Sequence, residues 1–459
     1  MSDRRQSRSL RVAVFNSVAL ALVAGSLAGC TSGIDSLSEL NPFKGDEKLL
    51  QGERRSLRAD GALPEVANTT ASYGAARDIG DWPQSGGTAA NDPGNIAYSG
   101  SGRLAWSVKA GQTGESGGAY GFYGADQRVS ARPVVSGGTV FTYDPTGNVT
   151  AINLSSGGRV WSANIRPKEE GDTVNGGGVA ATGGRVFVST GYGEVVGLDA
   201  GSGARVWTAK LDAPARSAPA VSGGKVFVVT RTNSVIAIDA AAGSVLWTVE
   251  TNSAAASLLA TASPAVVGDT VIVPTSTGDI AALSIADGSQ KWSVSVSGGS
   301  RSLAVAGLGD ASASPVVDNG VLFATGIGGR TIAAKAQNGE QIWSQPIGSA
   351  HTPVVSGSSV FIVDLDGRAV AFDRSKGTIL WATQLPKNPD AKRTTWAGPL
   401  LGNGKLWLVS VHGRLARVDA ATGTLEQTSK LNVEGVLPPI ASGGTMLILG
   451  GQGNLIALR

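Results

Sequence analysis

Tryptophan is distributed along this chain in a pattern that limits the folds the chain can adopt. Seven of the ten tryptophans follow a glycine by four positions, and an eighth copy of the pattern carries glutamine in place of the ring. The copies stand roughly 40–55 residues apart, the length of a four-stranded blade in a β-propeller. The glycine and ring positions are Gly102 and Trp106, Gly157 and Trp161, Gly203 and Trp207, Gly243 and Trp247, Gly288 and Trp292, Gly339 and Trp343, Gly377 and Trp381, and Gly423 and Gln427.

Each repeat unit shows the same succession of strand and turn signals. A proline precedes a short first strand, a turn of the Gly-Gly type follows, and an apolar second strand comes next, as in Val226-Phe227-Val228. A second turn leads to an alternating third strand, and the Gly-x3-Trp pattern begins the fourth. Short runs of this kind bounded by Gly and Asn or Asp are antiparallel hairpins. The prolines are Pro133, Pro219, Pro264, Pro315, Pro353 and Pro399.

The two ends of the repeat array complete each other. Residues 439–458 offer three strands without a Gly-x3-Trp pattern, whereas the segment around Trp106 offers a fourth strand without the first three. Sharing strands from both termini in one blade closes a ring and removes the open end of a repeat array. The sequence therefore predicts an all-β, eight-bladed β-propeller of four-stranded antiparallel blades, closed by the N- and C-terminal strands.

Composition agrees with a β-rich globular fold and excludes several other classes. Glycine accounts for 65 of 459 residues, about twice its usual share, and 42% of residues are hydrophobic. Such a chain can bury a core, which argues against disorder and against a coiled coil. The formal charge of +3 comes from the first 29 residues, which hold four arginines and one aspartate, so the remainder is neutral. A neutral chain without a basic stripe is not expected to bind nucleic acid.

The N-terminus has the features of a targeting segment. An arginine-rich stretch precedes an apolar run over residues 12–27, and Leu27-Ala28-Gly29-Cys30 is similar to the lipobox of bacterial lipoproteins. We therefore expect a lipoprotein signal peptide over residues 1–29, a lipidated Cys30 with a flexible tether over residues 30–79, and the propeller over residues 80–459. Thr31 stands where an aspartate would retain a lipoprotein in the inner membrane, which favours the periplasmic face of the outer membrane. The alternative is an ordinary secretory signal that ends near a cysteine.

The repeat also carries a family resemblance. Asp199, Gly203 and Trp207 follow an Asp-x3-Gly-x3-Trp spacing that resembles the tryptophan-docking repeat of pyrroloquinoline-quinone-type propellers. Together with the lipobox, the polar tether and the opening Trp82-Pro83-Gln84, the chain resembles the BamB family, lipoprotein accessory factors of the outer-membrane β-barrel assembly machinery. This resemblance implies a non-catalytic scaffold without cofactors that binds POTRA domains of a BamA-like barrel component and aids outer-membrane protein folding and insertion. Unfolded outer-membrane proteins are a further candidate partner.

The same resemblance implies residues for the partner interface. In this family a loop before the proline of one blade carries leucines and an arginine, and the corresponding loop of the next blade carries aspartates. The matching positions here are Leu258 and Leu259 in the first loop and Asp310 in the second. Leu259 stands where the arginine is expected, so Arg301 in the second loop is the candidate to supply the missing charge. The alternative is that the two leucines only fill space between blades.

Two other functions remain open at this stage. Quinoprotein (pyrroloquinoline-quinone-dependent) dehydrogenases share the repeat, but they hold the quinone with Ca²⁺, often beneath a disulfide of adjacent cysteines, and Cys30 is the only cysteine here. His351 and His412 have no metal-ligand spacing, and we expect them at turns or blade edges, so no catalytic, cofactor or metal residues are predicted. A third possibility is a propeller that binds peptidoglycan or another envelope polymer, which would show exposed tryptophans. The only candidates are Trp82, Trp396 and Trp407, because the other tryptophans occupy the repeat position.

Three short motifs have a structural explanation. Residues 114–118 match the letters of a G-x-S-x-G nucleophile elbow but lack its strand–turn–helix context. Residues 364–367 (Asp-Leu-Asp-Gly) resemble the start of a calcium loop, yet they stand at a hairpin position and predict a turn. Gly176-Gly177-Gly178 lacks the lysine and helix of a phosphate loop and predicts a tight crossing of chains.

Overall fold

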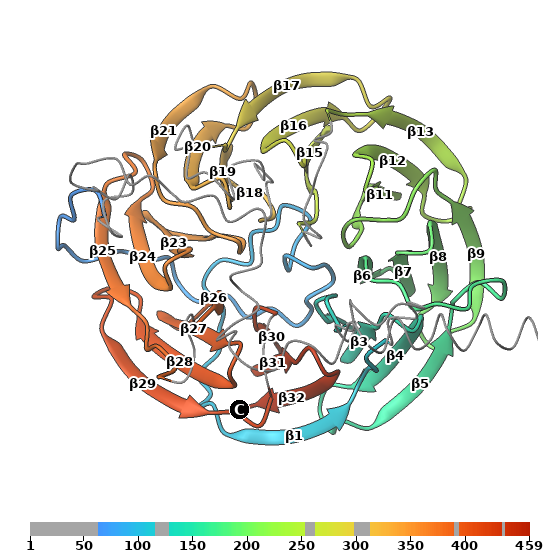
Figure 1. The fold of residues 1–459 in the computed structure, drawn as a ribbon, viewed down its shortest axis with the longest axis horizontal. Helices are drawn as coiled ribbons and strands as arrows, with labels where there is room; N and C mark the ends of the chain where they lie inside the picture. The colour runs from blue at the N-terminus through green and yellow to red at the C-terminus, as the bar shows by residue number, and fades with distance from the viewer. Residues whose placement is uncertain (1–62, 115–127, 253–261, 298–312, 390–393, 434–436) are drawn as a thin grey trace, which may run out of the picture. The chain divides into compact units, whose positions relative to one another are not determined.

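The computed structural model describes residues 63–114, 128–252, 262–297, 313–389, 394–433 and 437–459. The described residues form eight antiparallel sheets of four strands each and contain no helix. The sheets are arranged as the blades of a propeller around a central axis (Figure 1). The predicted eight-bladed fold is therefore confirmed.

Seven blades are continuous in sequence and run from the innermost to the outermost strand. Blade 1 consists of β2 (Val134–Ser136), β3 (Thr139–Tyr143), β4 (Asn148–Asn153) and β5 (Arg159–Asn164), and blade 2 consists of β6 (Gly177–Thr182), β7 (Arg185–Thr190), β8 (Glu194–Asp199) and β9 (Arg205–Lys210). Blade 3 consists of β10 (Ala220–Ser222), β11 (Lys225–Val229), β12 (Ser234–Asp239) and β13 (Val245–Glu250), and blade 4 consists of β14 (Ala265–Val267), β15 (Thr270–Pro274), β16 (Asp279–Ser284) and β17 (Gln290–Ser295). Blade 5 consists of β18 (Val316–Asp318), β19 (Val321–Gly326), β20 (Arg330–Lys335) and β21 (Gln341–Gln345). Blade 6 consists of β22 (Val354–Ser356), β23 (Ser359–Val363), β24 (Arg368–Asp373) and β25 (Ile379–Gln384). Blade 7 consists of β26 (Trp396–Gly402), β27 (Lys405–Ser410), β28 (Arg414–Asp419) and β29 (Leu425–Lys430).

Blade 8 is made from both ends of the repeat array. Its inner strands are β30 (Ile440–Ser442), β31 (Thr445–Leu449) and β32 (Asn454–Leu458), and its outermost strand is β1 (Leu104–Lys109). The β1 and β32 strands pair antiparallel, with Trp106 opposite Ala457. The predicted closure by strands from both ends is confirmed.

Packing inside a blade alternates large and small side chains across the strands. In blade 3, Phe227 of β11 lies opposite Ala237 of β12, which in turn lies opposite Trp247 of β13. The small alanine leaves room for the phenyl and indole rings to approach, with their centroids 6.0 Å apart. Phenylalanine and tryptophan make the same tilted contact in blades 1, 2, 5 and 6.

Packing between blades uses the glycine that precedes each repeat tryptophan. The indole of Trp161 in blade 1 donates a hydrogen bond to the carbonyl of Ala200 in blade 2, at 2.9 Å. The ring lies against Gly203, where an added Cβ would stand 2.6 Å from the indole and where φ is +74°. Only glycine satisfies both conditions. The same hydrogen bond to the next blade is made by the other repeat tryptophans except Trp292, whose indole nitrogen has no partner among the described residues.

The junction between blades 7 and 8 replaces this contact with different residues. Gln427 occupies the ring position and is exposed, and Arg417 of β28 lies opposite it in place of a small residue. Trp407 of β27 fills the space instead, with its ring 5.5 Å from that of Tyr98 and 5.7 Å from the Arg417 guanidinium. Trp407 also lies against Gly102, where an added Cβ would stand 3.4 Å from the indole.

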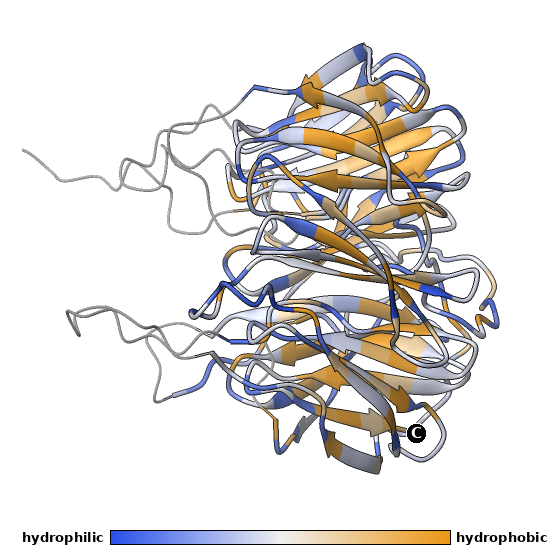
Figure 2. Cartoon of the chain, turned by 90° about the vertical axis from the view of Figure 1, so that its right-hand side faces the viewer, coloured by the Kyte–Doolittle hydropathy of each residue, from blue (hydrophilic) through white to orange (hydrophobic). Residues whose placement is uncertain are grey.

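The two faces of the propeller differ in the connections that they carry. We call the hairpin face the side with the turns between first and second strands and between third and fourth strands. The loop face carries the turns between second and third strands and the connections from one blade to the next. Figure 2 shows the strands running from one face to the other.

A segment before the first strand ties the ring together along the central axis. We call residues 72–98 the strap; it hydrogen-bonds to the innermost strand of every blade. Trp82 pairs with Val135 in blade 1, and the next two residues continue the contact, with Ala181 in blade 2 donating to the Pro83 carbonyl. The Gln84 side-chain amide then exchanges two hydrogen bonds with the backbone of Val221 in blade 3. The Trp82-Pro83-Gln84 segment thus joins blades 1, 2 and 3 to one another.

Residues 63–79, which the sequence analysis places in the tether, also contact the propeller. Val66 forms a parallel bridge with Ile379 at the start of β25, and the backbone of Ala71 donates to the carbonyl of Ala421. The side chains of Leu63 and Val66 pack against the core of blades 5 and 6. The structured chain therefore extends further toward the N-terminus than residue 80, because apolar side chains isolated in a polar stretch find partners on the hairpin face.

The docking tryptophans should carry much of the stability of the ring. We expect Trp247→Ala to lower the free energy of unfolding by about 3–5 kcal/mol, because it removes a large side chain and leaves a cavity between blades 3 and 4. Chemical denaturation monitored by circular dichroism measures this change. A loss below about 1 kcal/mol would contradict the docking role.

The matched control introduces a tryptophan at residue 427, the repeat position that carries glutamine. Gln427→Trp should not stabilise the protein, because Trp407, Tyr98 and Arg417 already occupy the junction of blades 7 and 8. A gain comparable to the loss in Trp247→Ala would show that this junction has unfilled space.

Candidate functional site

The residues that the family resemblance assigns to the partner interface lie outside the described residues. Leu258 and Leu259 belong to residues 253–261, and Arg301 and Asp310 belong to residues 298–312. Cys30 also lies outside the described part of the chain. Their roles therefore stay predictions, and the structure describes the residues that precede and follow the two loops.

The C-terminal ends of the two loops meet. The backbone N–H of Ser263, which follows the first loop, donates to the Oγ of Ser314, which follows the second, at 2.9 Å. Asn91 of the strap lies behind both, and its side-chain amide donates to the carbonyls of Ser263, Pro264 and Pro315 at 3.0–3.4 Å. The two loops are therefore fixed to one another where each returns to the innermost strand of its blade.

The N-terminal end of the first loop is held by Asn233. Its carbonyl accepts hydrogen bonds from the backbone and the hydroxyl of Thr251, and its side-chain amide donates to the carbonyl of Asn252 at 3.0 Å. The same amide donates to the Oγ of Ser276 in blade 4, and its oxygen accepts from the guanidinium of Arg216. Asn233 is buried, with φ at +63°, so it takes the turn position that glycine holds in other blades and adds a side chain that joins two blades.

The second loop starts from a comparable latch. The backbone of Val296 donates to the carbonyl of Gly278, and Ser297 forms an antiparallel bridge with Gly329 of the next blade. Both loops thus leave the loop face between blades 3 and 5 from ends that the folded blades position. Sequence reasoning missed Asn91 and Asn233, although an asparagine at the glycine position of the repeated turn is a signal that could have identified the second.

Two basic side chains lie near each other ahead of the innermost strands of blades 1 and 6. Arg132 donates a hydrogen bond to the carbonyl of Ser85 in the strap, and burial lowers its pKa to about 10. Burial, with a smaller contribution from the Arg132 charge, lowers the pKa of His351 to about 4. His351 is therefore neutral at pH 7 and lies, partly buried, in the bend before β22, whereas His412 lies in an exposed turn of blade 7.

The described residues offer little for holding a metal. They contain no group of three or more His, Cys, Asp or Glu side chains placed to bind an ion. The turn at residues 364–367 is the predicted hairpin: Gly367 donates to the Asp364 carbonyl, and the Asp364 carboxylate accepts from the backbone and side chain of Arg368. The glycines of residues 176–178 form the predicted crossing, since an added Cβ at Gly177 would stand 1.9 Å from the Ser189 carbonyl oxygen.

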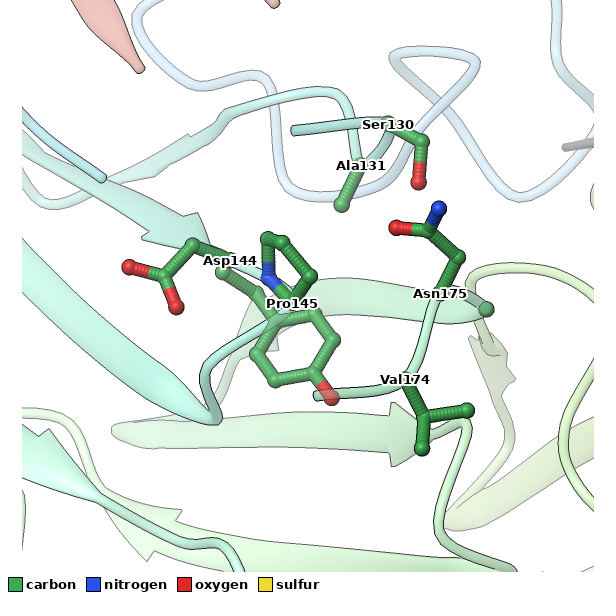
Figure 3. Close-up of a pocket in the computed structure, with 8 residues that line it drawn as sticks. Ser130, Ala131, Asp144, Pro145, Val174 and Asn175 are labelled. Carbon is green, nitrogen blue, oxygen red and sulfur yellow. The ribbon is translucent and has the colours of Figure 1, made fainter. Parts of the chain in front are cut away.

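The cavities near the loop face are small or open. The pocket in Figure 3, between blades 1 and 2, has a volume of about 10 Å³, room for one water molecule. Its lining includes the Asn175 side chain and the Tyr143 hydroxyl, whose oxygens have no partner among the described residues. An open cleft of about 370 Å³ nearby is lined by Glu169, Glu170 and other residues of blades 1 and 2. Neither has the enclosed volume that a quinone cofactor would need.

The tryptophans outside the repeat positions are buried. Trp82, Trp396 and Trp407 expose 2–3% of their surface. They therefore offer no platform for stacking a sugar ring, which counts against the envelope-polymer hypothesis. Among the described residues, no helix is long and apolar enough to span a bilayer.

The comparisons with known proteins agree with the repeat pattern. The family described as outer membrane protein assembly factor BamB matches residues 89–179 and 145–383, well over half of the chain. No curated protein matches the sequence.

Solved structures with a similar fold include a BamB protein and two dehydrogenases. BamB from Moraxella catarrhalis has a TM-score of 0.64 and 19% identity, over 78% of this chain and 99% of that chain. Quinohemoprotein alcohol dehydrogenase from Comamonas testosteroni has a TM-score of 0.63 and 16% identity, over 83% of this chain and 81% of that chain. A europium-containing methanol dehydrogenase has a TM-score of 0.63 and 15% identity, over 83% and 89%. At these identities the likeness concerns the fold alone.

Two interior groups should make stability depend on pH in opposite directions. His351, with its pKa lowered to about 4, costs stability as the pH falls from about 6.5, because the unfolded chain takes up the proton first. Burial raises the pKa of Asp92 in the strap to about 6, with a smaller contribution from Asp318, so this carboxyl adds stability over the same range on acidification. The two effects should largely offset each other between pH 7 and pH 5.

Single substitutions separate the two effects. Relative to the parent protein, His351→Asn should gain stability on going from pH 7 to pH 5, and Asp92→Asn should lose it, each by up to about 1.4 kcal/mol per pH unit. Urea denaturation at several pH values provides the measurement. Parallel pH profiles for all three proteins would contradict the assignment.

Proposed function

The chain belongs to the family of outer membrane protein assembly factor BamB, and from this membership we propose that it is a non-catalytic scaffold of the β-barrel assembly machinery. In this proposal it binds POTRA domains of a BamA-like barrel component and aids the folding and insertion of outer-membrane proteins. Family membership supports an outer-membrane-associated, periplasmic location. Lipid anchoring through Cys30 is part of the proposal, and loss of acyl labelling in Cys30→Ser tests it.

One structural observation supports the loop face as the partner surface. The ends of the loops at residues 253–261 and 298–312 are joined by the hydrogen bond from Ser263 to Ser314 and are held by Asn91. A rigid base limits the entropy that the loops lose when a partner binds. The described residues that follow the two segments with the family's interface positions, Ser263 and Ser314, therefore lie next to each other.

The interface should depend more on its apolar anchor than on its charges. We expect Leu258→Asp to weaken capture of the POTRA-bearing partner by at least about 2 kcal/mol, because central apolar side chains carry more affinity than charges at the rim of an interface. Asp310→Arg should weaken capture mainly at low salt, since electrostatic mismatch is screened as ionic strength rises. Surface plasmon resonance with the immobilised POTRA domains measures both.

Two exposed residues on the hairpin face provide controls. Asp287→Arg makes the same change of charge as Asp310→Arg, and Lys376→Glu adds negative charge as Leu258→Asp does. Both controls stand in turns before repeat tryptophans, on the hairpin face. Both variants should bind the partner normally. If a control abolishes capture while the loop variants bind normally, the interface lies elsewhere on the propeller.

The second candidate function is that of a quinoprotein dehydrogenase. The fold is shared with quinohemoprotein alcohol dehydrogenase, but the chain has a single cysteine and therefore cannot form the adjacent-cysteine disulfide found in many such enzymes. We expect no binding of pyrroloquinoline quinone with calcium at micromolar concentration and no dye reduction with alcohols or sugars. Stoichiometric quinone binding by calorimetry would favour the enzyme.

A further inference from the structure

Ion pairs are distributed unevenly around the propeller. Within the described residues, the ion pairs outside the strap all lie in blades 4 to 7, for example Lys291 with Asp269 and Lys335 with Glu340. Blades 8, 1, 2 and 3 carry basic residues at the hairpin-face ends of their strands that form no ion pair with a described residue. They are Arg103, Arg159, Arg185, Arg205 and Lys225.

The acidic residues on this side of the hairpin face are fewer and already hydrogen-bonded. Asp199 and Asp239 accept hydrogen bonds from backbone N–H groups of their own turns, and Asp81 accepts from the backbone of Gly137. Five basic side chains thus stand near three aspartates, and this part of the surface carries net positive charge, although residues 30–459 together are neutral.

Exposed apolar side chains gather on the same blades. Leu104 in blade 8 is 60% exposed, Val160 in blade 1 is 54% exposed and Val206 in blade 2 is 46% exposed. Val245 and Leu246 in blade 3 are 48% and 46% exposed. Three of these residues immediately precede a repeat tryptophan, at the bulge where the outermost strand starts. Ile342, 43% exposed, holds that position in blade 5, and Lys291 and Glu426 hold it in blades 4 and 7.

These residues share one edge of the molecule. We call the basic residues named above and these five apolar residues the basic rim; it follows the hairpin-face ends of four consecutive blades. Figure 2 shows this side of the propeller, with apolar and polar segments alternating along the strands. A row of exposed apolar side chains flanked by cations that form no ion pair with a described residue is the chemistry of a surface that binds anionic lipid.

The chain also enters the propeller on the hairpin face. Val66 bridges Ile379 at the hairpin-face end of β25, and Gly74 donates to the Oγ of Ser356 next to the first turn of blade 6. Val66 stands 36 positions after Cys30, the expected lipidation site. A flexible chain of that length would reach on the order of 30 Å. The anchor and the basic rim would therefore act on the same face.

We propose that the basic rim binds the surface of an anionic phospholipid bilayer and tilts the propeller so that its loop face points away from the membrane. The proposal rests on the proposed outer-membrane location. A bilayer fits better than an acidic peptide because the residues are spread over four separate blades, which an extended surface contacts together and a single strand does not. In this orientation the loop face is directed toward a periplasmic partner.

Vesicle binding without the acyl anchor tests the proposal. The protein is the chain from residue 30 with Cys30→Ser, which retains every described residue. It should sediment with vesicles of phosphatidylethanolamine and phosphatidylglycerol in a roughly 3:1 ratio, more weakly as salt rises, and not with phosphatidylcholine vesicles. Equal binding to both vesicle types, or no binding at low salt, would overturn the proposal.

Variants assign the binding to the basic rim. Arg103→Glu with Arg159→Glu should lower the partition coefficient at least about fivefold, since each basic residue near an anionic surface is worth about 1 kcal/mol. A second variant, Val160→Ser with Val206→Ser and Leu246→Ser, should lower it at least about threefold through the loss of apolar contact. Melting curves confirm that each variant is folded.

A charge-matched control and a partner assay complete the test. Lys387→Glu with Arg414→Glu reverses two exposed charges on the loop face of blades 6 and 7 and should leave vesicle binding within about twofold of the parent. An equal loss in this control would show that net charge alone acts. The variants of the basic rim should capture POTRA domains normally in the absence of vesicles. A loss of capture in these variants would make the basic rim part of the partner interface and overturn the proposal. Failure of the parent protein to capture POTRA domains would count against the scaffold function alone.

Discussion

The contact between an indole and the glycine of the next blade organises this propeller. Trp161 on Gly203 shows its components: a ring in one blade, a carbonyl acceptor and a residue without a Cβ in the next. Each such contact couples only two neighbouring blades, so the ring depends on the contact being repeated. A substitution at either partner loosens one junction and exposes apolar strands on both sides of it.

A ring of pairwise contacts also needs a different solution where the chain ends meet. Blade 8 borrows β1, and the junction with blade 7 uses Trp407 and Tyr98 in place of a repeat tryptophan. The strap adds a second kind of closure, because it touches every innermost strand within one short segment. Gln84 and Asn91 each link the strap to blades more than 100 residues away in sequence.

The division into two faces connects this architecture to function. The N-terminal chain joins the propeller on the hairpin face at Val66, whereas the connections from one blade to the next lie on the loop face. The hydrogen bonds of Ser263, Ser314 and Asn233 hold the ends of the two loops that the family resemblance singles out. The same fold also serves a quinohemoprotein alcohol dehydrogenase, so the proposed function depends on particular side chains and not on the fold.

The sequence by itself determined the blade count, the strand order within a blade and the closure at blade 8, because each depends on a local pattern that repeats. It also identified the docking tryptophans, since Gly203 and Trp207 recur at a constant spacing. Only the tertiary structure decided the path of the strap, the packing of Trp407 at the junction where Gln427 stands in place of a repeat tryptophan, and the partly buried position of His351. The physical reason is that these features depend on contacts between residues far apart in sequence, such as Asn91 with Pro315, and no periodicity in the chain records them.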